Sequence, residues 1–101
     1  MSFKLDYYVL STEADFDLEQ IYDYTEINFS YQQAIKYLTE LDFVFKQLVI
    51  NPNIGRKRNE VKLGLFSISE QEHTIFYRIL ENHIRIVRIL HGSKDLPKNF
   101  K

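Results

Sequence analysis

The chain has 101 residues, of which 45% are hydrophobic and 15% are aromatic, and its formal net charge is -1. This length and composition predict one packed domain over residues 1–101 and argue against disorder. The sequence has no cysteine, which excludes disulfides and thiolate metal sites. It shows neither a secretory signal pattern nor a run of roughly 20 apolar residues, so we expect a cytoplasmic protein that does not enter membranes. The near-neutral charge argues against strong direct binding to nucleic acid.

The chain begins with a predicted strand followed by a predicted helix. Apolar and aromatic residues alternate in FKLDYYVL, which indicates a strand over residues 3–10. Ser11 or Thr12 can cap the amides at the start of the next segment, and its first acidic residues suit the positive end of a helix. Helical spacing of apolar residues then predicts a helix over about 12–29. Its tyrosines, including Tyr24, are interpreted as packing residues.

A second helix is predicted directly after the first. Ser30 is followed three residues later by Gln33, which is the spacing of a capping box. NPNIG at 51–55 ends this helix, because the residue before a proline is biased away from helix and glycine permits a turn. The short connection makes the two helices antiparallel. Residues 55–62, GRKRNEVK, are predicted to be a polar, basic loop.

The last third of the chain predicts three short strands, over about 63–70, 73–80 and 83–91, joined by tight turns. The whole order is a strand, an antiparallel helical hairpin and three antiparallel strands, followed by a short C-terminal tail. Helices followed by antiparallel strands give the α+β class.

Both faces of the predicted sheet carry apolar residues. Strict alternation along 83–91 puts Ile84 and Ile86 on one face and Val87 and Ile89 on the other. The helical hairpin can cover only one face, so a partner or the tail is expected to cover the other. The alternative is a sheet twisted around one core, with its arginines extending to solvent.

Charge is divided along the chain. Residues 1–50 hold most of the acidic side chains and residues 56–101 hold most of the basic ones. Arg56, Lys57 and Arg58 form the densest basic cluster, for which a solvated loop is the simplest interpretation. The functional alternative is a docking point for carboxylates, which arginine binds with two parallel hydrogen bonds. We therefore expect an acidic partner on the second half of the chain.

Several short motifs, in this order and spacing, resemble the ParE toxins of the RelE/ParE superfamily, the toxin halves of bacterial type II toxin–antitoxin modules. The resemblance runs from about Tyr7 to Asp95, nearly the whole chain. The motifs are LS followed by Ala14, Asp17, Leu18 and Ile21; NP followed by Gly55 and Arg56; His73 with Phe76, Tyr77 and Arg78; and RILH with Asp95 four residues later.

The resemblance implies a helical hairpin packed on a small antiparallel sheet. It also implies a growth-inhibiting toxin of the plasmid-stabilisation kind, which inhibits DNA gyrase without catalysis and needs no cofactor. The expected partner is a cognate acidic antitoxin, ParD-like or similar, with gyrase as the target. The residues expected to bind the antitoxin are Arg56, Arg58, Arg78, Arg85, Arg88 and Phe100.

The related RelE toxins supply the alternative, a ribosome-dependent mRNA endoribonuclease. On that interpretation Arg78 and Arg85 stabilise the negative charge on the reacting phosphate, and His91 is the general acid that protonates the leaving oxygen. Some RelE members carry a tyrosine after that histidine, where this chain has Gly92, so we expect no catalytic residues. His91 and Asp95 are instead expected to hold the tail against the sheet. The three scattered histidines predict no metal site.

Overall fold

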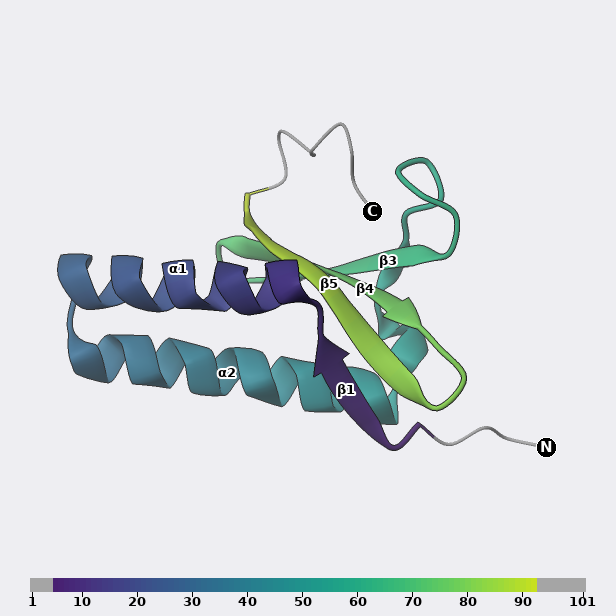
Figure 1. Ribbon diagram of the computed structural model, residues 1–101, viewed down its shortest axis with the longest axis horizontal. Helices are drawn as coiled ribbons and strands as arrows, with labels where there is room; N and C mark the ends of the chain where they lie inside the picture. The colour runs from purple at the N-terminus through teal and green to yellow at the C-terminus, as the bar shows by residue number, and fades with distance from the viewer. Residues whose placement is uncertain (1–4, 93–101) are drawn as a thin grey trace.

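The computed structural model describes residues 5–92. Two helices form an antiparallel hairpin against one face of a five-stranded sheet, and one end of the hairpin projects beyond the strands (Figure 1). The strand order is β1-β5-β4-β3-β2; β1 runs parallel to β5 and all other neighbours are antiparallel. The predicted α+β class is confirmed. The elements are β1 (Tyr7–Leu10), α1 (Thr12–Asn28), α2 (Tyr31–Ile50), a 3-10 turn (Pro52–Ile54), β2 (Arg56–Lys57), β3 (Leu65–Glu70), β4 (His73–Ile79) and β5 (His83–His91).

Serine side chains fix the starts of both helices, as their spacing predicted. The Ser11 hydroxyl accepts a 2.9 Å hydrogen bond from the Ala14 amide at the start of α1. The Ser30 hydroxyl accepts one of 3.0 Å from the Gln33 amide at the start of α2. Each bond satisfies an amide that has no partner within its helix. Ser11 also donates to the Val87 carbonyl at 2.7 Å, which ties the start of α1 to β5.

The segment after α2 returns the chain to the edge of the sheet. The Tyr77 hydroxyl accepts a hydrogen bond from the Gly55 amide and donates one to the Pro52 carbonyl. A side chain on Gly55 would lie 2.2 Å from that hydroxyl, so the close approach requires glycine. Arg56 and Lys57 then pair with β3, so part of the segment predicted as a loop is the edge strand β2.

The main core lies between the helical hairpin and the sheet. Its members recur at helical spacing in α1 and α2 and at alternate positions in the strands. Each helix and each strand therefore buries one side. Its buried residues are Leu5, Ala14, Ile21, Tyr37, Leu41, Phe45, Leu48, Ile75, Tyr77, Ile84, Ile86 and Ile89.

A bulge in β5 breaks the expected alternation. Phe76 of β4 is paired with Arg88, and the next residue, Tyr77, is paired with Ile86, so Val87 is an extra residue in β5. An extra residue shifts the following side chains to the opposite face.

The bulge changes which apolar residues share a face. Ile86 and Ile89 both join the core under the helices, while Val87 packs with Leu65 and Phe76 in a second buried cluster. The prediction that Ile89 and Val87 share a face is therefore wrong.

We call the face of the sheet that points away from the helices the outer face. It carries Leu65, Ser67, Ser69, Thr74, Phe76, Arg78, Arg85 and Val87. Val61 and Leu90 pack against its apolar centre, and the Arg58 guanidinium carbon lies 5.5 Å from the centre of the Phe76 ring. The predicted tail residues, including Asp95 and Phe100, lie outside the described residues. Over residues 5–92, no helix has the length and apolar character needed to cross a membrane.

Candidate functional site

Two arginines lie at opposite positions of neighbouring strands on the outer face of the sheet. Arg78 of β4 and Arg85 of β5 are direct partners in the antiparallel ladder. Arg78 donates only a long 3.3 Å hydrogen bond, to the Leu63 carbonyl, and Arg85 is exposed. Over residues 5–92, neither guanidinium forms an ion pair with a carboxylate. Like charges directly opposite each other destabilise a sheet, so this pair presents two uncompensated charges to a partner.

Aromatic and apolar groups lie beside this arginine pair. Tyr7 stacks on His83 with ring centres 5.1 Å apart and planes 3° from parallel. Val9 is the ladder partner of Arg85, and both Val9 and Leu80 are partly exposed. The surface therefore suits a segment that is acidic and partly apolar. Sequence reasoning missed the Tyr7–His83 stack because it depends on the parallel pairing of two distant segments.

Arg88 has a different environment from Arg78 and Arg85. Its Nε and Nη2 donate hydrogen bonds of 2.9 and 3.0 Å to the two carboxylate oxygens of Asp17. Asp17 is buried and also accepts a 2.9 Å hydrogen bond from the Ile89 amide. The hydrogen bond to Asp17 raises the pKa of Arg88 above its usual value. Arg88 therefore joins α1 to β5 within the chain.

Arg56 and Arg58 lie at the opposite edge of the outer face. Arg56 is exposed in β2 and is the ladder partner of Ser67. Arg58 is largely buried, pairs with Glu60 at 2.7 Å and donates a 3.1 Å hydrogen bond to the Ser67 hydroxyl. The predicted arginines thus form three separate environments rather than one continuous patch.

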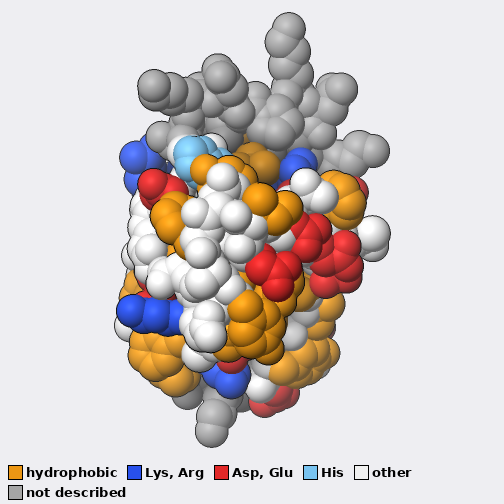
Figure 2. All heavy atoms as spheres, turned by 90° about the vertical axis from the view of Figure 1, so that its left-hand side faces the viewer, with side chains coloured by type: hydrophobic (Ala, Val, Ile, Leu, Met, Phe, Trp, Pro, Cys, Tyr) orange, Lys and Arg blue, Asp and Glu red, His pale blue; other side chains and the backbone are white. Residues whose placement is uncertain are grey.

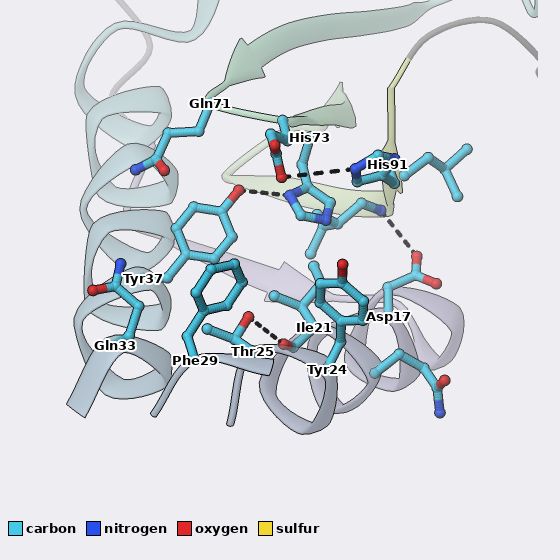
Figure 3. Close-up of a pocket in the computed structure, with 14 residues that line it drawn as sticks. Asp17, Ile21, Tyr24, Thr25, Phe29, Gln33, Tyr37, Gln71, His73 and His91 are labelled. Atoms are coloured by element: carbon cyan, nitrogen blue, oxygen red, sulfur yellow. Dashed lines mark hydrogen bonds and ion pairs between the residues drawn. The ribbon is translucent and has the colours of Figure 1, made fainter. Parts of the chain in front are cut away.

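A pocket of about 830 Å³ lies between the helices and the ends of β4 and β5 (Figure 3). His73 projects toward it, with Nδ1 2.6 Å from the Tyr37 hydroxyl of α2. The His73 ring meets His91 edge to face at 5.4 Å, and His91 Nε2 lies 3.7 Å from the Glu72 carboxylate. Burial lowers the pKa of His73, with His91 acting in the same direction, and burial raises the pKa of Tyr37 to about 12.

The structure does not bring His91 to the arginine pair. His91 ends β5, six positions beyond Arg85, and six strand residues span roughly 20 Å. Its described contacts are with Glu72 and His73, and the predicted contact with Asp95 lies outside the described residues. In the part of the chain that the structure describes, no three His, Asp or Glu side chains are arranged to hold a metal ion.

The end of the helical hairpin exposes large apolar side chains. Figure 2, which views this end, shows hydrophobic and acidic side chains side by side. Tyr24 is 62% exposed, so its interpretation as a packing residue is wrong, whereas Tyr22 meets Tyr31 edge to face at 6.5 Å. Ile27 and Phe29 are also highly exposed.

Comparisons with known proteins agree with this architecture. A family model described as the ParE toxin of the type II toxin–antitoxin system parDE matches residues 8–96. Toxin ParE1 of Mycobacterium tuberculosis is 39% identical over 93 residues, covering 91% of this chain and 95% of that protein. Toxin ParE1 of Caulobacter vibrioides is 30% identical, covering 87% and 91%.

A solved chain from the chromosomal ParDE toxin–antitoxin system of P. aeruginosa shares the fold. Its TM-score is 0.77 at 21% sequence identity, and the match covers 91% of this chain and 100% of that chain. The fold, the family match and the identity to curated toxins together lead to one conclusion. The chain belongs to the family of ParE toxins of type II toxin–antitoxin systems.

Proposed function

We propose that this ParE-family toxin inhibits DNA gyrase without catalysis and is silenced by a cognate acidic antitoxin. The observation that carries the antitoxin part is the Arg78–Arg85 pair on the outer face. Carboxylates from a partner would supply charge-assisted hydrogen bonds to the two like charges at these opposite ladder positions. The gyrase part follows from the resemblance to ParE toxins, which are associated with poisoning that enzyme.

The surroundings of the arginine pair support a peptide partner. Val9, Leu80 and the Tyr7–His83 stack offer apolar contact area next to the two positive charges. An acidic segment with alternating apolar residues would match both features, as extended peptides do when they lie on a sheet. Arg56 is a second exposed cation for such a segment, whereas Arg88 is already bound to Asp17.

The geometry gives little support to the ribonuclease alternative. A general acid must lie within hydrogen-bond reach of the group it protonates, directly or through one water. His91 is roughly 20 Å along β5 from Arg85, and its nearest described carboxylate is Glu72. The three groups of that interpretation therefore do not surround one phosphate.

The two functions are separated by measuring both in the same cells. The chain is induced with and without co-expression of the proposed antitoxin, and plasmid supercoiling and the ends of ribosome-bound mRNA are followed. We expect loss of negative supercoiling, reversed by the proposed antitoxin, with no new mRNA ends. Normal supercoiling together with codon-phased mRNA cuts would contradict the proposal.

Purified gyrase provides the direct test. The chain should inhibit supercoiling of relaxed plasmid in a dose-dependent manner, and prior addition of the antitoxin should prevent this inhibition. A His91→Ala variant that folds should inhibit as strongly as the parent chain, because the proposed action involves no proton transfer by His91. Loss of inhibition in that variant would give His91 a direct functional role.

A further inference from the structure

A second pocket, of about 430 Å³, opens between β2, β3 and β4 on the outer face. Within residues 5–92, it shares no lining residue with the pocket beside His73. The ladder register brings its polar groups together, because Arg56 is opposite Ser67 and Ser69 is opposite Thr74. We call this the β2–β3 pocket.

The hydrogen bonds in the β2–β3 pocket leave donors free. Arg58 is held by Glu60 and by Ser67, whose hydroxyl oxygen accepts the Arg58 Nη1 hydrogen bond at 3.1 Å. The Ser67 hydroxyl therefore keeps its own hydrogen to donate. Thr74, by contrast, donates its hydrogen to the Gly92 carbonyl at 3.0 Å and can only accept.

Arg56 and Ser69 complete the set of available donors. Neither side chain forms a hydrogen bond or ion pair with any other residue in the described range 5–92. Among residues 5–92, no carboxylate lines the β2–β3 pocket, and Glu60, whose charge interacts with Arg56, is paired with Arg58. The pocket thus combines the positive charge of Arg56 with the hydroxyl donors of Ser67 and Ser69.

A pocket with a cation and several donors, and with no acidic lining among the described residues, fits an oxyanion. The Arg56 fork can bind two oxygens, and hydroxyls from two positions of β3 can reach others. A planar carboxylate has only two oxygens, which one guanidinium can already satisfy, whereas a tetrahedral anion can use the additional hydroxyl donors. We infer that the β2–β3 pocket binds a phosphate group, free or as a phosphate ester. This inference is independent of gyrase inhibition.

The test is a titration of the ¹⁵N-labelled full chain with inorganic phosphate, followed by NMR at constant ionic strength and pH. Amide signals around Arg56, Ser67 and Ser69 should shift and saturate, and sulfate should move the same signals. Chloride and acetate at the same ionic strength should not produce saturating shifts. Equal responses to acetate and phosphate would overturn the assignment to a tetrahedral anion.

Substitutions locate the site. Arg56→Gln should raise the phosphate dissociation constant by about tenfold, the loss expected for one charge-assisted contact. Lys57→Gln is the matched control, because it removes the same charge from the adjacent position of β2, opposite Phe66 rather than Ser67. Ser69→Ala, which removes one exposed hydroxyl, should weaken phosphate binding and leave the fold intact. Equal losses in the Arg56 and Lys57 variants, or full binding by Ser69→Ala, would overturn the proposal.

Discussion

Asp17 and Arg88 form an ion pair within the chain, which sets Arg88 apart from the arginines proposed to bind a partner. Asp17 is 9% exposed and receives three hydrogen bonds, two from Arg88 and one from the Ile89 amide. Asp17→Asn should lower the free energy of unfolding by about 2–4 kcal/mol, because it removes a charged acceptor and leaves Arg88 without a counter-charge. Urea denaturation measures the loss.

The matched control for Asp17 lies on the same helix. Glu19→Gln removes one negative charge from an exposed position of α1 and should change stability by less than about 0.5 kcal/mol. Equal effects of the two substitutions would show that the charge of α1, rather than the Asp17–Arg88 contact, sets stability. Arg88 would then be as available to a partner protein as Arg78 and Arg85 are.

His73 makes stability depend on pH. Its pKa is lowered by burial and by His91, while Glu72 and Asp17 act in the opposite direction, and Tyr37 contacts its ring directly. A histidine with a lowered pKa in the folded state takes up fewer protons than the unfolded chain. Its contribution to stability is therefore complete above the unfolded pKa of about 6.5 and is lost as pH falls toward the folded value.

The corresponding measurement is the unfolding free energy between pH 7.5 and pH 5. We expect it to decrease as the pH falls through this range, and we expect His73→Asn to reduce the slope. His83→Asn is the control, because His83 stacks on Tyr7 at the other end of β5 and leaves His73 in place. A slope unchanged by His73→Asn would assign the acid sensitivity to the carboxylates.

At the scale of elements, one serine joins two parts of the fold. Ser11 caps α1 and donates to the Val87 carbonyl of β5, while Ser30 only caps α2. Ser11→Ala should cost about 2–3 kcal/mol, since it removes a helix cap and a buried hydrogen bond, and Ser30→Ala should cost about 1 kcal/mol. Thermal and urea unfolding of the two variants give the comparison. Equal costs would mean that the contact with β5 adds nothing to the cap.

The same elements show what local sequence can predict. The starts of α1 and α2 follow from capping serines and the spacing of nearby residues, and both were predicted closely. The bulge at Val87 was not, because it depends on the ladder with β4 and on Ser11, which lies 76 positions away in the chain. Strict alternation therefore failed beyond Ile86, where the strand leaves its regular register.

At the scale of the molecule, the arginines predicted to bind the antitoxin lie in different environments. Their residue type pointed to an anionic partner, yet only long-range contacts distinguish them. Arg88 binds a carboxylate 71 positions away, whereas Arg78 and Arg85 are ladder partners on neighbouring strands. The Tyr7–His83 stack and the β2–β3 pocket likewise arise from pairing between distant segments.

Because Arg78 and Arg85 occupy opposite ladder positions, we predict that they lower the stability of the free chain and raise its affinity for the antitoxin. Arg85→Gln removes one of two like charges at opposite ladder positions and should stabilise the isolated chain by about 0.2–1 kcal/mol. This gain should shrink in 1 M salt, where charges are screened within about 3 Å. The same substitution should weaken antitoxin binding by about 2–5 kcal/mol, because a carboxylate buried in the complex would lose its partner.

Lys36→Gln is the control for Arg85→Gln, since it removes one exposed positive charge from α2, on the opposite side of the molecule from the outer face. Calorimetry gives the binding constants, and urea denaturation of the free chains gives the stabilities. An Arg85→Gln variant that is less stable and binds normally would identify the arginine as structural. An equal loss of binding in both variants would attribute antitoxin recognition to overall charge. Opposite changes in stability and affinity, confined to the Arg85 variant, are what we expect of two arginines that lie at opposite ladder positions without a described carboxylate partner.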